Sequence, residues 1–386
     1  MAKVLLVDTN VSSSPIYKYL RNTGHEVFVV GSNPNDFLAK CTDRYIPLDY
    51  SDVSALHALI NELSISYLIP GCNDVSYKVC AQVNKDGHFP GIDTLSNNEI
   101  LNNKKSYRVF AQEHQLPVPR VYCNDHIGDI RFPIIVKPVD AFSGHGITIV
   151  HDSDPRHLEA AIAMARHHSK SESYLIEDFV SGQLHSHSAF IADGKVLTDF
   201  IVEEHCTANS FAVDTSRVLS DFPTHELQIL RFAAEKMATM LRLKDGLLHT
   251  QFLWNGKSVW LIEPTRRCPG DLYSRLIELS TGVNYAENYT RPFLGLTHQF
   301  STDTSIKSLV MRHTVTDRSG GNFWTLRFPK TANVFEFVAL SRSGDPIKVA
   351  PAGRIGILFI GANTPEEFEQ VYRRTIAREL YNCTED

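Results

Sequence analysis

The segment Ile134-Ile-Val-Lys137-Pro138-Val-Asp-Ala-Phe-Ser143-Gly144-His145-Gly146 joins a short apolar run, a lysine and a glycine-bearing loop. The apolar run predicts a buried strand that ends at Lys137, and a second β-rich run, residues 146–151, follows the loop. Glycines let a loop backbone approach a ligand closely, and a lysine supplies a compact positive charge. The pattern favours a strand, loop and strand that close over a polyphosphate. Taken alone, it fits an ordinary hairpin with a solvated lysine equally well.

The segment Tyr174-Leu-Ile-Glu177-Asp178-Phe179-Val180-Ser-Gly182 predicts a strand that runs into a turn. Its backbone presents N–H and C=O groups beside apolar side chains, and an acidic side chain lies next to them. Such a segment suits the edge of an adenine ring, which offers one acceptor and one amino donor. The alternative is a strand end with two solvated acids.

Residues 247–254 and 258–263 predict a hairpin, because the turn-forming pair Asn255-Gly256 separates them. Gln251 and Glu263 then lie on adjacent strands, where their oxygen atoms can face one hard cation. Mg²⁺ is usually held by one or two carboxylates together with substrate phosphates, and this pair fits that pattern. The hairpin is therefore a candidate metal site.

Arg266 and Arg267 follow Glu263 directly and offer planar, bidentate recognition of a carboxylate or phosphate. The alternative for the two arginines is a basic pair on the surface. The apolar run 259–262 predicts burial near Glu263, so we expect the surface alternative to suit Arg266 better than Glu263.

In this order and with these separations, the three segments resemble the ATP-grasp superfamily, and the resemblance covers nearly the whole chain. It implies that Lys104, thirteen residues before Pro117, is the first phosphate-binding lysine, with Lys105 as the alternative. It implies that Lys137, in a Lys-Pro pair ahead of the loop, is the second.

The resemblance also implies roles for the remaining site residues. The expected nucleotide contacts are the loop residues Ser143, Gly144, His145 and Gly146 and the hinge residues Glu177, Asp178, Phe179 and Val180. The expected ligands of Mg²⁺ or Mn²⁺ are Gln251, Glu263 and Thr265. Arg267 would hold the acyl phosphate or the incoming carboxylate, so Arg267 and Lys137 are the expected catalytic residues.

Three positions depart from the family pattern. The position that often holds the ribose hydroxyls is Leu184, so Gln183 or His185 replaces that contact or the contact is missing. The metal-site asparagine is Thr265, which has a shorter side chain. The first metal ligand is Gln251 rather than a glutamate, which removes one negative charge from the site.

The bulk properties exclude several classes of protein. With 43% hydrophobic and 21% charged residues among 386, the chain is an ordinary globular protein. A net charge of -6, without a basic cluster, argues against nucleic acid as a partner. No apolar run is long enough for a membrane helix and the N-terminus lacks the features of a signal peptide, so we expect no membrane and a cytoplasmic location. Seven cysteines without a C-x-x-C pair argue against a disulfide framework and a zinc site.

The predicted fold class is mixed α/β and α+β. A β-α-β unit over residues 3–30 predicts an N-terminal open parallel sheet, the pre-ATP-grasp domain, over residues 1–99. The expected remainder is a linker helix near 100–114 with a small lobe to 185, a large lobe over 186–304, and a small C-terminal β-rich part of that lobe over 305–386. A homodimer would suit this fold.

The resemblance implies an enzyme that activates a small-molecule carboxylate with ATP and joins it to an amine. One alternative is a protein that binds nucleotide without turnover, and a second is a carboxylase that uses bicarbonate. The segment 203–217, with Arg312 and His313, is a candidate wall of the substrate pocket, although an ordinary loop and strand explain these residues at least as well.

Overall fold

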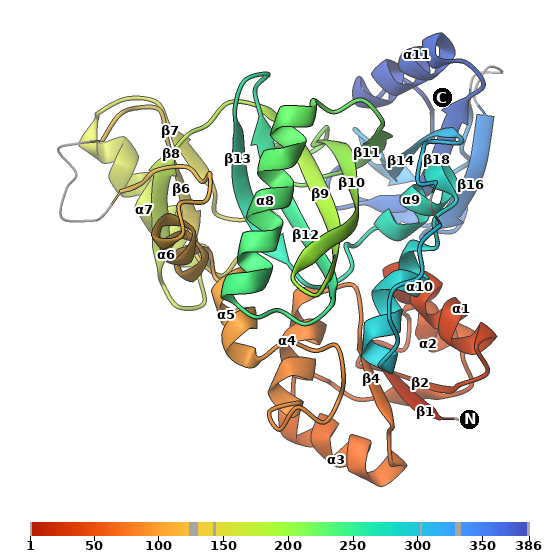
Figure 1. Ribbon diagram of the computed structural model, residues 1–386. Helices are drawn as coiled ribbons and strands as arrows, with labels where there is room; N and C mark the ends of the chain where they lie inside the picture. The colour runs from red at the N-terminus through yellow and green to blue at the C-terminus, as the bar shows by residue number, and fades with distance from the viewer. Residues whose placement is uncertain (1, 123–129, 142–143, 302, 329–332, 384–386) are drawn as a thin grey trace.

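The computed structural model describes residues 2–122, 130–141, 144–301, 303–328 and 333–383 (Figure 1). The N-terminal sheet is parallel, as predicted, with strand order β3-β2-β1-β4. Its strands are β1 (Lys3–Val7), β2 (Glu26–Gly31), β3 (Tyr45–Pro47) and β4 (Tyr67–Pro70). Its helices are η1 (Val11–Ser13), α1 (Ser14–Asn22), α2 (Phe37–Cys41), α3 (Val53–Leu63) and α4 (Asp74–Val83). The strands are buried apolar runs, as a parallel sheet covered by helices requires.

The linker differs from its prediction, because two helices replace the single helix expected near 100–114. Helix α5 (Leu95–Asn102) ends at Asn103, and helix α6 (Lys104–Glu113) begins after it. The Asn103 side chain accepts hydrogen bonds from the backbone N–H groups of Lys105 and Ser106 and so caps α6. This cap puts Lys104 at the first residue of the new helix.

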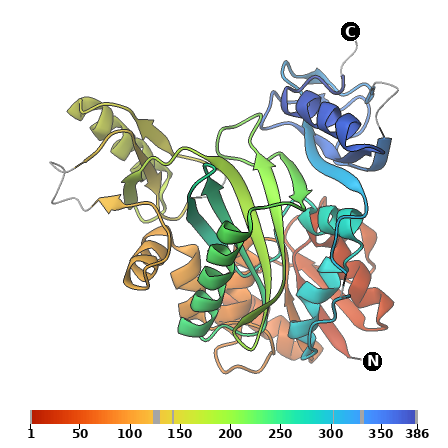
Figure 2. The ribbon, with the colours of Figure 1, turned by 45° about the horizontal axis from the view of Figure 1, so that its top comes forward.

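The small lobe is a four-stranded sheet of order β5-β8-β6-β7 with one covering helix. Its elements are β5 (Val121–Tyr122), β6 (Ile134–Pro138), β7 (Thr148–Val150), α7 (Pro155–His168) and β8 (Tyr174–Asp178). A separate buried cluster, which includes Ile134, Val136, Leu158 and Ile176, joins the sheet to α7. The phosphate-loop strands are therefore held in a unit with its own small core, which stands apart in both views (Figures 1 and 2).

The large lobe is an eight-stranded antiparallel sheet of order β13-β12-β9-β10-β11-β14-β18-β16. Its strands are β9 (Gln183–Ala192), β10 (Lys195–His205), β11 (Thr215–Leu219), β12 (Gly246–Trp254), β13 (Val259–Thr265), β14 (Leu309–Thr316), β16 (Asn333–Ala339) and β18 (Arg354–Ala362). Helix α8 (Thr224–Met240) covers one face (Figure 1), and its buried residues Leu230, Ala234 and Met237 belong to the core beneath it. The remaining elements are α9 (Tyr273–Thr281), α10 (Tyr285–Thr290), η3 (Arg291–Leu294), α11 (Pro365–Ile376) and the β15 (Gly321–Asn322) and β17 (Pro346–Ile347) pair.

The fold class is confirmed, with one refinement at the C-terminus. Strands β14, β18 and β16 extend the large sheet itself, and α11 packs on them to form a cluster of its own. No helix in the described part of the chain is long and apolar enough to cross a membrane. The six described cysteines are free, and Cys123 lies outside the described residues.

Candidate functional site

Two of the three predicted metal ligands, Gln251 and Glu263, face each other across the β12–β13 ladder. Gln251 pairs with Glu263, and on the other side Gln251 pairs with Ser186 of β9. Because side chains alternate between the faces of a sheet, these three residues share one face. This face is the one opposite α8, whose neighbours on β12 are Leu248 and Phe252. The hairpin predicted from Asn255-Gly256 therefore brings Gln251 and Glu263 together.

Lys104 and Glu263 lie close together at the edge of this face. The Lys104 Nζ donates to the carbonyl oxygen of Ala141 at 2.9 Å and lies 3.9 Å from the Glu263 Oε2. The Glu263 side chain is 51% exposed, whereas Arg266 is buried. The expectation that Glu263 is the more buried of the two is therefore wrong. The physical reason is that Glu263 lies near the end of β13, where its side chain faces the small lobe. Lys105, the alternative lysine, is exposed.

Lys137 belongs to a buried three-residue ion-pair network. Its Nζ donates to the Glu177 carboxylate at 2.8 Å, and the Arg108 Nε donates to the same carboxylate. Burial alone would raise the pKa of Glu177, but Lys137 and Arg108 hold it below its ordinary value. Arg108 also donates from Nη1 to the carbonyl oxygen of Ile262 at 2.8 Å, one residue before Glu263. The network thus ties α6 and the small lobe to the metal-site strand.

Arg108 was missed in the sequence, although one signal was available. Residues four apart on a helix share a face, so Arg108 lies on the same side of α6 as Lys104. A buried arginine one turn after a phosphate-binding lysine is a candidate for positioning the site.

Some backbone groups of the predicted hinge, residues 177–180, already form hydrogen bonds within the protein. The N–H groups of Asp178 and Phe179 donate to the carbonyl oxygens of Arg120 and Pro133, at 2.9 and 3.1 Å. The Glu177 side chain belongs to the ion-pair network, and the Tyr122 hydroxyl donates to Asp178. A base placed at this hinge would therefore rely on other backbone groups, such as the N–H of Val180.

The phosphate loop lies against the β10–β11 connection. Ser143 falls outside the described residues, but Gly144 and Gly146 both have a positive φ, near 75°. A side chain at Gly144 would collide with Phe211. The imidazole of His145 stacks on His168, with ring centroids 6.1 Å apart. Glycine is required at residue 144 by both backbone conformation and space.

Among the candidates for the ribose contact, His185 is ruled out by its position. It pairs with Phe252 and stacks on its ring, on the face that α8 covers, and is 2% exposed. Burial lowers its pKa. Because the side-chain period along a strand is two, His185 points away from the face that carries Gln251. Gln183 starts β9, and its Nε2 donates to the carbonyl oxygens of Leu184 and Glu204.

Gln251 has a carboxylate neighbour that the sequence did not single out. Its Nε2 donates to the Glu204 Oε2 of β10 at 2.7 Å. Glu204 is 3% exposed, and burial raises its pKa, with hydrogen bonds from Ser186 and Gln251 opposing the rise. Glu204 thus brings a second carboxyl group to the face of the predicted metal site.

Thr265 and Arg267 are both connected to the N-terminal unit through Asp74. The Arg267 guanidinium pairs with both Asp74 oxygens, at 2.9 and 3.2 Å, and the Thr265 hydroxyl donates to the same carboxylate at 3.3 Å. Burial would lower the pKa of Arg267, but Asp74 raises it overall. Asp74 begins α4, far from Arg267 in the chain, so sequence spacing gave no sign of the pair.

Arg266 forms a second link to the N-terminal unit, and its burial excludes the alternative of a surface residue. Its Nε donates to the Asp93 carboxylate at 2.6 Å, and its Nη groups donate to the carbonyl oxygens of Leu247 and Lys244. Both partners of the ion pair have nearly buried side chains. Arg266 therefore has a structural role beneath the site.

Arg312 presents a buried guanidinium on the same side of the sheet. Its Nη2 donates to the Ser216 hydroxyl at 2.9 Å, and its Nη1 lies 3.6 Å from the Asp271 carboxylate. The Nε atom is buried and has no hydrogen-bond partner among the described residues. Buried donors are nearly always satisfied, so this one indicates a place for an acceptor. His313, by contrast, is buried and bonded to Thr215 and Tyr381.

The oxygen-bearing groups at the site fit a hard cation only with help from phosphate. Glu263 supplies one carboxylate and Gln251 one amide oxygen, while Thr265 is engaged by Asp74. In the described ranges, no three His, Cys, Asp or Glu side chains form a metal-binding group. Mg²⁺ is commonly held by one or two protein oxygens plus substrate phosphates, so these residues suit a nucleotide-bound cation.

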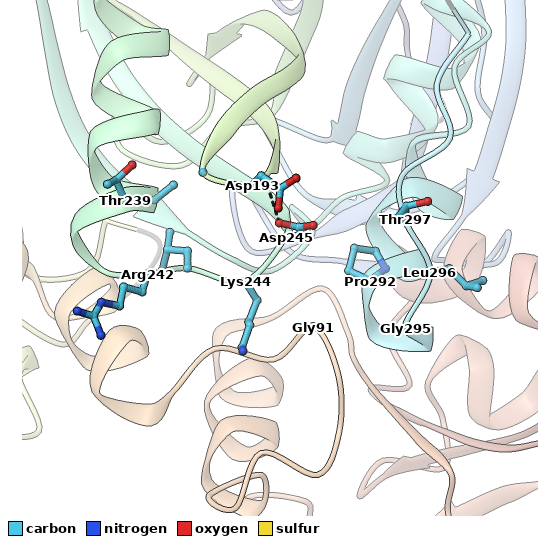
Figure 3. A pocket seen from close by; sticks show the side chains of 13 residues that line it. Gly91, Asp193, Thr239, Arg242, Lys244, Asp245, Pro292, Gly295, Leu296 and Thr297 are labelled. Carbon is cyan, nitrogen blue, oxygen red and sulfur yellow. Dashed lines mark hydrogen bonds between the residues drawn. The ribbon is translucent and has the colours of Figure 1, made fainter.

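A separate depression of about 570 Å³ lies by the C-terminal end of α8, the β9–β10 turn and η3 (Figure 3). Arg242, Lys244, Asp193 and Asp245 contribute to its lining. Its lining includes none of the predicted site residues. The candidate site is therefore the face of the large sheet that the small lobe approaches.

Comparisons with known proteins give similarities in sequence and in fold. Residues 130–274 match the family model described as "ATP-grasp domain". A cyanophycin synthetase from Synechocystis is 30% identical over 110 residues, which cover 26% of this chain and only 12% of that protein. A formate-dependent phosphoribosylglycinamide formyltransferase from Burkholderia pseudomallei is 24% identical over 391 residues, covering 97% and 94%. The crystal structure of an L-amino acid ligase from Bacillus licheniformis has a TM-score of 0.77 at 17% identity, covering 100% and 99%.

Proposed function

Because residues 130–274 match the family model described as "ATP-grasp domain", we propose that this protein is an ATP-dependent ligase that activates a small-molecule carboxylate as an acyl phosphate. Transfer of the γ-phosphoryl group from ATP to the carboxylate leaves ADP, and an amine then displaces phosphate, which gives an amide or peptide-like bond and free phosphate. The names of the similar proteins support a carboxylate substrate, since they include formate and an L-amino acid.

One observation carries the proposal: the phosphate-binding lysine of the linker and the metal-site glutamate face the same space. Lys104 lies 3.9 Å from Glu263, and it bonds to Ala141 beside the phosphate loop. Lys137 enters from β6 through the buried network with Glu177. The positive charge of Lys104 and the carboxylate of Glu263 thus lie side by side, as the binding of a nucleoside triphosphate with its cation requires.

In the proposed reaction the protein supplies binding, orientation and exclusion of water. A bound Mg²⁺ would neutralise charge on the phosphoryl oxygens, with Gln251 and Glu263 as its protein ligands. Lys104, Lys137 and the N–H groups of the loop at Gly144 and Gly146 would orient the γ-phosphate for in-line attack. The loop contact with Phe211 would keep water away from the acyl phosphate.

Two arginines are placed to bind the carboxylate. Arg267 already holds a carboxylate in bidentate fashion, that of Asp74, and so has the geometry for acid recognition. Arg312 has an unpartnered buried Nε. We assign Arg312 to the ground-state carboxylate and Arg267 to the charge that develops during transfer.

The competing function is nucleotide binding without turnover, which the substitutions at Leu184, Gln251 and Thr265 keep open. A bicarbonate-using carboxylase ranks lower, because the loop lacks the extra glycine-rich stretch of biotin-type sites. Cytoplasmic location and a homodimer belong to the same proposal; free thiols are typical of a reducing compartment.

Phosphate release with a panel of amino acids and other small carboxylates, with and without amines, tests the proposal. We expect ADP and phosphate to form only when the right carboxylate is present, and Glu263→Gln to abolish the reaction while the protein stays folded. ADP formation that no carboxylate influences would refute the ligase. Nucleotide binding without turnover on any substrate would favour the competing function.

A further inference from the structure

The amide at Gln251 poses a problem that a glutamate in its place would not. Both oxygens of a carboxylate can bind a cation, but only one of the two polar atoms of an amide can. If the amide is turned the wrong way, its NH₂ group meets the metal and repels it. A metal site that contains Gln251 therefore needs something that fixes the direction of the amide.

Glu204 is the residue that meets this need. Its Oε2 accepts a hydrogen bond from the Gln251 Nε2 at 2.7 Å, which turns the Oε1 of Gln251 away from Glu204. The strand register explains the contact: Glu203 pairs with His185 on the α8 face, so Glu204 lies on the same face as Ser186 and Gln251.

The surroundings of Glu204 make its position well defined. The residue is 3% exposed, so little water competes for the hydrogen bond. Ser186 and Arg312 also lower the pKa of Glu204, against the rise that burial causes. Buried polar partners of this kind hold one rotamer, because losing a buried hydrogen bond costs more than an exposed one.

We propose that Glu204 is a positioning residue, which orients the amide of Gln251 so that its Oε1, and not its Nε2, faces the cation beside Glu263. The role rests on the proposed function, since it requires the Gln251–Glu263 pair to bind a nucleotide-bound cation. This role explains how a metal site can include an amide, that of Gln251, at a position where a carboxylate would otherwise bind the cation. The hydrogen bond needs only an acceptor oxygen at residue 204.

The test measures binding of Mn²⁺ to the protein in the presence of a non-hydrolysable ATP analogue, by electron paramagnetic resonance, with no turnover involved. Glu204→Met keeps the size and removes the acceptor, whereas Glu204→Gln keeps an acceptor and removes the charge. Loss of such an outer-shell partner typically weakens metal binding by about 10- to 100-fold, which is the loss we expect for Glu204→Met. Glu204→Gln should lose less affinity than Glu204→Met, because its amide oxygen can still accept from Gln251, although its NH₂ group also permits the reversed orientation.

A second arm uses Gln251→Glu, which places two equivalent oxygens at the metal and needs no orientation. In that background, Glu204→Met should cost no Mn²⁺ affinity, and relief of repulsion between two carboxylates should even increase it. Equal losses for Glu204→Met with either residue at 251, or equal losses for the Met and Gln variants, would overturn the positioning role. Circular dichroism and thermal melting show that each variant is folded.

The outcomes separate this inference from the proposed function. If the unaltered protein binds Mn²⁺ with the analogue and Glu263→Gln abolishes binding, the metal site stands, and an unchanged affinity in Glu204→Met refutes only the role of Glu204. If Glu263→Gln binds Mn²⁺ as tightly as the unaltered protein, the metal site itself is refuted, and the role of Glu204 falls with it.

Discussion

Arg312 has a buried Nε without a hydrogen-bond partner among the described residues, which makes it a candidate for binding a carboxylate. We expect Arg312→Met to raise the KM for the carboxylate by about 100-fold, since a charged hydrogen bond in a buried site contributes about 1.5–3 kcal/mol. Binding of ATP should be unchanged. Arg312→Lys should recover little, because an ammonium lacks the planar fork of the guanidinium.

Steady-state kinetics in both substrates, with isothermal titration of the ATP analogue, checks this expectation. The exposed Arg342→Met serves as the control for loss of one positive charge. A rise in the KM for ATP equal to that for the carboxylate would contradict the assignment.

Glu203, on the α8 face of β10, should make the free energy of unfolding depend on pH. Burial would raise its pKa, but His205 and Arg217 lower it to about 2, from an ordinary value of 4.5. A lowered pKa contributes stability above the unfolded value that is lost as the pH falls toward the folded value. We therefore expect stability to fall between about pH 5 and pH 2, and less steeply in Glu203→Gln. Urea unfolding across this pH range measures the slopes, with the exposed Glu159→Gln as the control. Parallel slopes for Glu203→Gln and the unaltered protein would refute the role of Glu203.

At the scale of elements, the break between α5 and α6 decides where Lys104 lies. Asn103 caps α6 through two backbone N–H groups, and Thr94 caps α5 through one. Either residue changed to alanine should cost about 1 kcal/mol of stability. Only Asn103→Ala should also raise the KM for ATP, because Lys104 is the first residue of α6. Chemical denaturation and kinetics on the two variants check this; equal effects on KM would argue against Lys104 as a phosphate ligand.

The phosphate loop is a second element whose geometry can be tested. At Gly144, an alanine meets both the positive φ and Phe211. We expect Gly144→Ala to weaken binding of the ATP analogue, and Gly144→Ala with Phe211→Ala to recover part of it. Gly24→Ala is the matched control, because Gly24 has a similar φ and open space around it. Calorimetric titration of the analogue measures all four proteins. If Gly24→Ala weakened binding as much, backbone strain alone would explain the effect.

The hairpin and the sheet faces show what the sequence could and could not predict. Asn255-Gly256 predicted the hairpin, but not the pairing of Gln251 with Glu263, because the loop spans residues 255–258 and a register shift follows Gln251. The face of His185 depends on how β9 aligns with β12, two strands separated by over fifty residues, and no local pattern carries that register. The same reason explains why the sequence did not predict roles for Arg108, Glu204 and Asp74, whose partners are distant in the chain.

At the scale of the whole molecule, neighbouring arginines join the large lobe to the N-terminal unit. Arg266 pairs with Asp93, and Arg267 pairs with Asp74. We expect Asp93→Asn to cost about 3–5 kcal/mol, because it leaves the buried charge of Arg266 without its counterion. Urea unfolding measures the loss, and Asp245→Asn, at an exposed loop, should stay within about 0.5 kcal/mol. A loss at Asp93 no larger than at Asp245 would show that the pair is dispensable.

The same two ion pairs limit how this protein can be divided. A truncated chain that began at α5 would retain every proposed nucleotide-binding residue but would lose Asp74 and Asp93, the counterions of Arg267 and Arg266. In such a fragment the positive charges of Arg266 and Arg267 would have no counterion, directly after the strand that carries Glu263. The part of the chain from α5 onward is therefore not expected to be stable by itself. If the N-terminal domain were exchanged for that of a similar protein, the new domain would need carboxylates in place of Asp74 and Asp93.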